Sequence, residues 1–112
     1  MNRRLKSPVH LRPETGKWWL IVHKEYDLEP HHTRLLTLAA EAFDRCGQAR
    51  EAIGADGITV RTADGGIKAH PAVAIERDAR LAFARLVREL DLDTGAPAER
   101  SRPPALSSNR RL

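Results

Sequence analysis

The sequence predicts a mainly α-helical domain that contains one small β-hairpin and carries a basic segment at each end. Three observations indicate this: stretches with the apolar spacing of helices, one short stretch in which apolar and polar residues alternate, and an uneven distribution of charge. We expect three helices, over about residues 16–26, 31–53 and 71–90. A β-hairpin over about residues 57–69 is expected between the last two helices.

The chain of 112 residues is long enough for one small domain. Only 4% of its residues are aromatic, so we expect a modest core and further apolar burial against copies of the same chain. The single Cys46 excludes an internal disulfide and is typical of a reducing compartment. No segment has the roughly twenty apolar residues of a membrane span, and no secretory signal precedes the domain. We therefore expect a soluble protein of the cytoplasm.

Charge divides the chain into three parts. Residues 1–12 carry four basic residues and no acidic one, residues 94–112 carry four against one, and residues 13–93 hold 11 basic and 14 acidic residues. We expect a disordered basic arm over 1–12, a helical oligomerisation domain over 13–93 and a disordered basic tail over 94–112. Basic ends favour a polyanionic partner, most often nucleic acid, although they could simply aid solubility. The predicted DNA-binding residues of the ends are Arg3, Arg4, Lys6, Arg12, Arg100, Arg102, Arg110 and Arg111.

Thr15 is the predicted N-cap of the first helix, which ends near Tyr26. Adjacent side chains on a helix diverge by about 100°, so Trp18 and Trp19 cannot point the same way. We expect one of them in the core and the other at a groove or a subunit contact.

The second helix should begin next to Pro30 and end at Gly54. Small and apolar residues along it recur at alternating steps of four and three, which is a heptad seam that lets another helix approach closely. A helical hairpin, a bundle and an oligomer would all use such a seam. The predicted oligomer seam is Leu35, Ala39, Ala42, Cys46, Ala49 and Ile53.

The hairpin is predicted from the alternation over 57–62, a glycine-rich turn over 63–66 and a return over 67–69. An isolated hairpin is only marginally stable in water. We therefore expect it to lie against the helices or to join the strands of a neighbouring copy.

His70 precedes Pro71, so His70 is a predicted cap and Pro71 the first residue of the third helix. The apolar stripe predicted for this helix is Ile75, Ala79, Ala82, Leu86 and Leu90. On the opposite side, Arg77, Arg80 and Arg88 are secondary candidates for DNA binding. The alternative is a solvated face with ion pairs such as the one between Glu76 and Arg80.

The sequence contains no His-Glu-x-x-His motif, no cysteine pair and no cluster of acidic residues. Cys46 lies on the apolar seam, where a buried thiol is expected. We therefore expect no catalytic residue, metal ion or cofactor, and no enzyme activity.

The order of these segments resembles the small subunits of phage terminases over about residues 14–106. The most specific part is Lys68-Ala-His-Pro71, which follows the Gly65-Gly66 turn and precedes a helix with Ile75-Glu-Arg. The resemblance implies a ring-forming component that engages viral double-stranded DNA and regulates the large terminase subunit in the cytoplasm of the infected bacterial host. The family's glycine after the last helix is replaced by Asp91, so we expect a less sharply ended helix.

Two other functions stay open. One is a small helical DNA-binding regulator that uses residues 72–90 as its recognition helix, although no compact helix-turn-helix is visible. The other is a helical adaptor that binds only proteins and has solubilising ends. Head-to-tail contacts through the seam would close into a ring if the rotation between copies permits.

Overall fold

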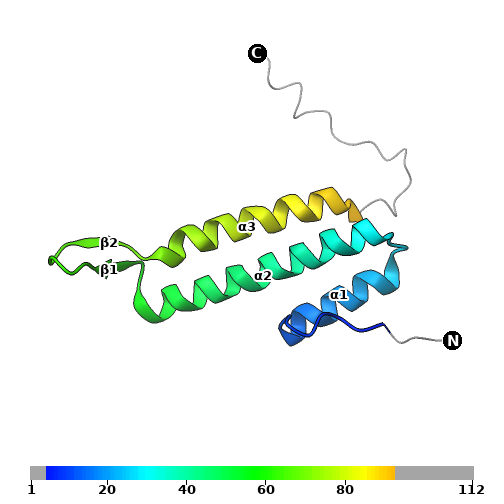
Figure 1. Cartoon of the computed structure of the whole chain (residues 1–112), viewed down its shortest axis with the longest axis horizontal. Helices are drawn as coiled ribbons and strands as arrows, with labels where there is room; N and C mark the ends of the chain where they lie inside the picture. The colour runs from blue at the N-terminus through cyan, green and yellow to red at the C-terminus, as the bar shows by residue number, and fades with distance from the viewer. Residues whose placement is uncertain (1–4, 93–112) are drawn as a thin grey trace, which may run out of the picture.

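Three helices and one β-hairpin make up residues 5–92, the part of the chain that this computed structural model describes. The elements in order are α1 (Pro13–Glu25), α2 (Pro30–Asp56), β1 (Thr59–Arg61), β2 (Ile67–Ala69) and α3 (Pro71–Leu90). The helices α2 and α3 lie side by side, and α1 packs along the first half of α2 (Figure 1). The three helices form one layer, and the hairpin extends beyond the end of α2 and α3 (Figure 1). This confirms the predicted helical class and the place of the hairpin between the last two helices.

The helix α1 begins earlier than predicted, because Pro13 rather than Gly16 starts it. Proline suits the first helical position, where its fixed φ fits and its missing N–H is not needed. Arg12 is the N-cap, so the assignment of this role to Thr15 is wrong. The hydroxyl of Thr15 is buried and instead donates a hydrogen bond of 2.6 Å to Oδ1 of Asp44 in α2.

The helix α2 begins at Pro30, next to the predicted start, but runs three residues past its predicted end at Ile53. Gly54 stays helical, and the helix ends where Gly57 takes a φ of 87° and donates its N–H to the Ile53 carbonyl at 2.7 Å. A positive φ is readily available only to glycine, so the C-cap falls at the glycine that adopts it. The prediction of Gly54 as the C-cap is wrong for this reason.

The hairpin pairs β1 and β2 antiparallel, with Val60 opposite Lys68. In the turn, Gly65 has a φ of 93°, and the Gly66 N–H donates to the Thr62 hydroxyl at 2.9 Å. The hairpin does not lie against the helices, since it projects beyond them and Ile67 is 68% exposed. Its pairing with strands of another copy stays a prediction.

The bounds predicted for α3 are confirmed. His70 caps the helix as predicted: its Nδ1 accepts a hydrogen bond of 2.9 Å from the Ala72 N–H. Its Nε2 lies 2.9 Å from Asp56 Oδ2, which ties the start of α3 to the end of α2. The expected gradual end of α3 is wrong, because Asp91 takes the left-handed conformation (φ 56°, ψ 53°) directly after Leu90. Aspartate is one of the few residues other than glycine that visits this conformation.

The side of α3 that faces α2 differs in part from the predicted stripe. Ala79 and Leu90 are buried, but Ile75 is 45% exposed, and Glu76 takes the inward position with 14% of its side chain exposed. Glu76 is tolerated there because two arginines bind its carboxylate. The residues of α3 that lie toward α2 are Ala72, Glu76, Ala79, Phe83, Leu86 and Leu90.

A small apolar core joins α1, the first half of α2 and the end of α3. Trp19 is 4% exposed and donates its Nε1–H to the Thr37 hydroxyl at 3.1 Å. Trp18 is half-buried, with its ring centroid 6.0 Å from that of Phe83. The prediction of one tryptophan in the core is confirmed for Trp19, and a subunit contact of Trp18 stays a prediction. Leu11 is 8% exposed and belongs to this core, so the packed part of the chain starts before residue 13.

The six residues of the seam are buried or half-buried within one chain. Cys46 lies on the side of α2 that faces α3, with its Sγ 3.8 Å from the carbonyl oxygen of Glu76. The partner of the seam within the chain is therefore α3. A use of the same seam between copies stays a prediction.

Candidate nucleic-acid interface

Arg77 and Arg88 are exposed on the side of α3 that points away from α2. The Nε of Arg77 lies 3.2 Å from Oδ1 of its neighbour Asp78. Arg88 forms no ion pair with any other residue of the described range 5–92. The two arginines therefore offer cationic groups to a partner at the outer edge of the layer.

Arg80 lies on the flank of α3 rather than with Arg77 and Arg88. Its Nη2 donates to both carboxylate oxygens of Glu76 at 2.7 Å, and Arg50 of α2 donates to the same carboxylate at 3.3 Å. The hydrogen bond from Arg80, reinforced by Arg50, holds the pKa of Glu76 below its ordinary value. The charge of Arg80 is thus compensated within the fold, which makes it a weak candidate for binding a phosphate.

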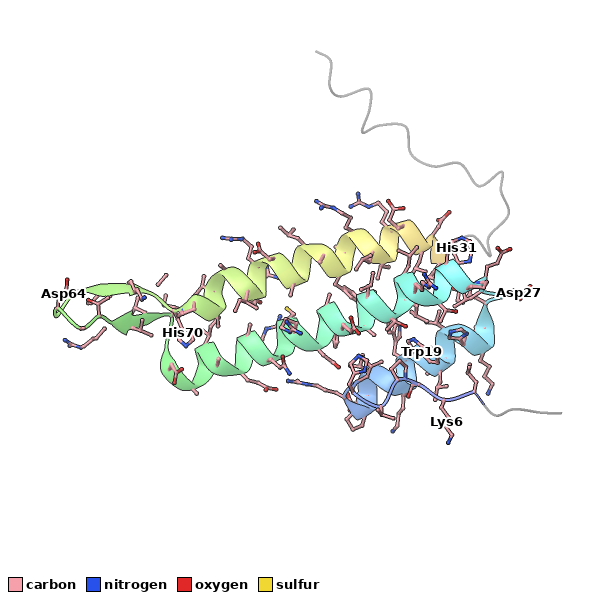
Figure 2. All side chains as sticks on the ribbon, in the orientation of Figure 1. Lys6, Trp19, Asp27, His31, Asp64 and His70 are labelled. Carbon is pink, nitrogen blue, oxygen red and sulfur yellow. The ribbon has the colours of Figure 1, made fainter. Side chains whose placement is uncertain are left out.

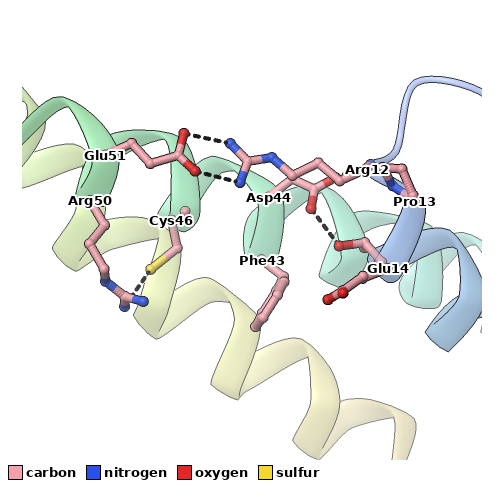
Figure 3. Close-up of a pocket in the computed structure, with 10 residues that line it drawn as sticks. Arg12, Pro13, Glu14, Phe43, Asp44, Cys46, Arg50 and Glu51 are labelled. Atoms are coloured by element: carbon pink, nitrogen blue, oxygen red, sulfur yellow. Dashed lines mark hydrogen bonds and ion pairs between the residues drawn. The ribbon is translucent and has the colours of Figure 1, made fainter.

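Of the DNA-binding residues predicted for the two ends of the chain, the structure describes Lys6 and Arg12, and their surroundings differ. Arg12 donates to both carboxylate oxygens of Glu51, at 3.1 and 3.2 Å, and its backbone N–H donates to Asp44 at 2.9 Å (Figure 3). Lys6 is exposed and points away from the helices (Figure 2). Lys6 is thus available to a ligand, whereas Arg12 serves the packing of α1 on α2. The remaining predicted end residues, Arg3, Arg4, Arg100, Arg102, Arg110 and Arg111, lie outside the described residues.

Two cationic residues of α1 were not predicted as candidates. Lys17 and Lys24 are seven residues apart, which places them on the same side of the helix, and both are exposed. Lys6 lines the same shallow surface groove as Lys17. We call these three residues the α1 lysine strip. The spacing of Lys17 and Lys24 is visible in the sequence, but the net acidic charge of residues 13–93 concealed it.

An open groove of about 650 Å³ lies between the start of α1 and the middle of α2 (Figure 3). The polar groups that line it bind one another: Thr15 binds Asp44, and Nη2 of Arg50 lies 3.6 Å from Sγ of Cys46. Among residues 5–92 no group of three or more His, Cys, Asp or Glu side chains could hold a metal ion. The groove therefore shows structural contacts rather than a pair of reacting groups.

No described helix is long and apolar enough to cross a membrane.

A family model described as phage terminase, small subunit, matches residues 17–108, which include most of α1 and all of α2, the hairpin and α3. The chain belongs to this family. The match confirms the resemblance read from the sequence. No curated protein and no solved structure gives a significant match.

In this member of the terminase small-subunit family, two groups of exposed cations lie on the helices α1 and α3, which form the two edges of the layer (Figure 1). Lys17 and Lys24 lie on the side of α1 opposite its buried residues, and Arg77 and Arg88 lie on the side of α3 away from α2. Membership of the family sets these two surfaces in the context of phage DNA packaging.

Proposed function

We propose that this chain is the DNA-binding, ring-forming small subunit of a phage packaging motor. It engages viral double-stranded DNA, regulates the large terminase subunit in the cytoplasm of the infected host, and performs no catalysis itself. The observation that carries the proposal is the family match over residues 17–108.

The distribution of charge supports the DNA-binding part. A duplex presents one negative charge per roughly 1.7 Å of its axis, and exposed lysine and arginine side chains bind it by displacing counterions. The α1 lysine strip follows the first basic residues of the sequence, since Arg3 and Arg4 precede Lys6, and Glu14 is the one acidic residue between Arg3 and Lys24. Such contacts position a protein on DNA without reading its sequence. We therefore assign DNA binding to the basic ends and the α1 lysine strip, with Arg77 and Arg88 as a second surface.

Binding to a short fluorescent duplex tests this assignment. Replacing Lys6, Lys17 and Lys24 together by glutamine removes three exposed cations that lie outside the core. We expect affinity at low salt to fall at least about tenfold, and the plot of log affinity against log salt to become less steep by about 0.9 per lost phosphate contact. A chain that lacks residues 94–112 should likewise bind the duplex with lower affinity at low salt and with a less steep dependence on salt.

The substitution Arg80→Gln is the control, because Arg80 is already bound to Glu76 and Arg50 still compensates that carboxylate in the variant. We expect it to leave DNA affinity within about twofold of the parent, as the charge it removes is compensated within the fold. Unchanged affinity in the lysine variant and in the shortened chain would contradict the assignment. A chain that binds no duplex even at low salt would favour a protein-only adaptor.

A further inference from the structure

The open groove between the start of α1 and the middle of α2 is lined by an exposed aromatic side chain (Figure 3). Phe43 is 55% exposed, although its ring lies 5.3 Å from that of Phe83. Gly47, four residues further along α2, also lines the groove and has no side chain to fill it. An aromatic ring beside open space is a surface that a proline-containing segment can cover.

The lining of the groove has more acidic than basic groups. Its charged residues are Glu14, Asp44, Glu51, Arg12 and Arg50. Arg12 binds Glu51, and Arg50 binds Glu76, so both cations are compensated. Glu14 is exposed and forms no ion pair within the described range 5–92. Figure 3 shows Glu14, Phe43 and Arg50 on the same side of α2, so the groove offers a free carboxylate next to the aromatic ring.

The chain itself contains a segment of matching composition. Residues 100–106 read Arg-Ser-Arg-Pro-Pro-Ala-Leu. Adjacent prolines favour the polyproline II conformation, whose preformed backbone binds aromatic-lined grooves at a low cost in entropy. The arginines before the prolines have the charge that complements Glu14. The segment therefore combines the apolar and the cationic groups that the groove lacks.

The chain is long enough for this segment to reach the groove. Leu92 still packs against the core, so the chain leaves α3 along the helical layer. Arg50, at the far end of the groove, binds Glu76, which lies 14 residues before the end of α3, or roughly 21 Å along the helix axis. Pro103 is eleven residues after Leu92 and can lie up to about 34 Å from it at 3.1 Å per residue.

We propose that residues 100–106 bind in the groove of their own chain, in the direction from the start of α2 toward its end. Pro103 and Pro104 cover the exposed ring of Phe43. Arg102 forms an ion pair with Glu14, which lies level with Phe43 because its neighbour in α1 binds Asp44 of α2. The aromatic ring and the free carboxylate then lie under one segment.

The spacing of the segment agrees with the spacing of the groove. Leu106 lies about 6 Å beyond the second proline in a polyproline II helix, and Gly47 lies about 6 Å beyond Phe43 in α2. Leu106 therefore falls over the glycine of the lining, where space is available. Ser107 falls about 9 Å beyond the second proline, close to Arg50, which lies about 10.5 Å beyond Phe43.

Disulfide trapping in the full chain tests the docking. The substitutions Arg50→Cys and Ser107→Cys place one thiol at the groove and one in the tail, and Cys46→Ala removes the native thiol. A flexible tail presents its thiol to the surface at an effective concentration in the millimolar range, and docking raises this concentration. A glutathione redox buffer measures it, and we expect at least about a tenfold increase over the control pair. Mass spectrometry of tryptic peptides identifies the bond.

The matched control carries Arg45→Cys in place of Arg50→Cys. Both arginines are exposed on α2, but Arg45 lies about 140° around the helix from Arg50 and faces away from the groove. This control measures random encounters of the tail with α2. Adding Pro103→Ser with Pro104→Ser to the groove pair should lower the effective concentration to that of the control. Glu14→Gln should lower it by up to about fivefold, because it removes one exposed ion pair.

Three results would overturn the docking. One is an equal effective concentration for the groove pair and the Arg45 pair, and another is a groove disulfide that the proline substitutions leave unchanged. The third comes from mixing chains labelled with nitrogen-15 and unlabelled chains, if the main disulfide product joins a tail to the groove of another copy. The docking goes beyond the proposed function because it requires no DNA. Since the assay contains no DNA, failure of the docking leaves the proposed function standing, and the converse also holds.

Discussion

At the scale of single residues, Glu76 shows how a charged side chain can occupy an inward position of a helix. Its bond to Arg80, four residues along α3, follows from helical spacing and is predictable from the sequence. Its bond to Arg50 comes from another helix, 26 residues away in the chain, and only the packing of α2 on α3 reveals it. Arg12 and Thr15 are similar cases, because their partners Glu51 and Asp44 also lie on α2.

The state of Glu76 predicts how stability depends on pH. The hydrogen bond from Arg80 lowers the pKa of Glu76 from its ordinary 4.5, so folding favours the ionised carboxylate. Its stabilising contribution is therefore complete above pH 4.5 and is lost as the pH falls through the lower folded-state pKa. We expect the difference in Tm between the parent and Glu76→Gln to be constant from about pH 7 to 5 and to narrow toward about pH 3. A thermal unfolding series with parallel curves down to the lowest pH would contradict this.

At the scale of elements, the two glycines near the end of α2 have opposite roles. Gly54 is helical and Gly57 has a φ of 87°, and an added Cβ would meet nothing within 4 Å at either position. Backbone conformation is therefore the main difference between them. We expect Gly54→Ala to raise the free energy of unfolding by about 0.5–1 kcal/mol. Gly57→Ala should lower it by about 1–2 kcal/mol. Urea unfolding measures both, and changes of the same sign would show that α2 ends elsewhere.

The existence and order of the helices could be predicted because apolar periodicity is a local property of the sequence. The ends could not be predicted as well, because Gly54 and Gly57 both suit a C-cap and only the observed φ separates them. The inward side of α3 was missed in part for a related reason. Periodicity alone does not reveal that Glu76 can replace Ile75 at the interface when arginines compensate its charge.

At the scale of the whole molecule, the three helices lie in one layer with α1 and α3 at its two edges (Figure 1). The edges carry the α1 lysine strip and the arginines Arg77 and Arg88. The two surfaces assigned to DNA therefore lie on opposite edges of the layer. The common side of Lys17 and Lys24 could be predicted from their spacing of seven residues, whereas the position of Lys6 beside Lys17 could not, because it depends on how the segment before α1 folds back.

Replacement of Lys17 and Lys24 should weaken DNA binding and leave the mass of the assembly unchanged, because both side chains are exposed and lie outside the seam of α2.

The central claim is that this chain engages duplex DNA through its phosphates, and the salt dependence of binding by the full chain tests it most directly. With about six phosphates engaged, the affinity should fall on the order of a thousandfold between 50 and 200 mM salt, along a straight line of log affinity against log salt. Duplexes of unrelated sequence should give nearly the same slope. An absence of binding at 50 mM salt, or an affinity that does not change with salt, would contradict the claim.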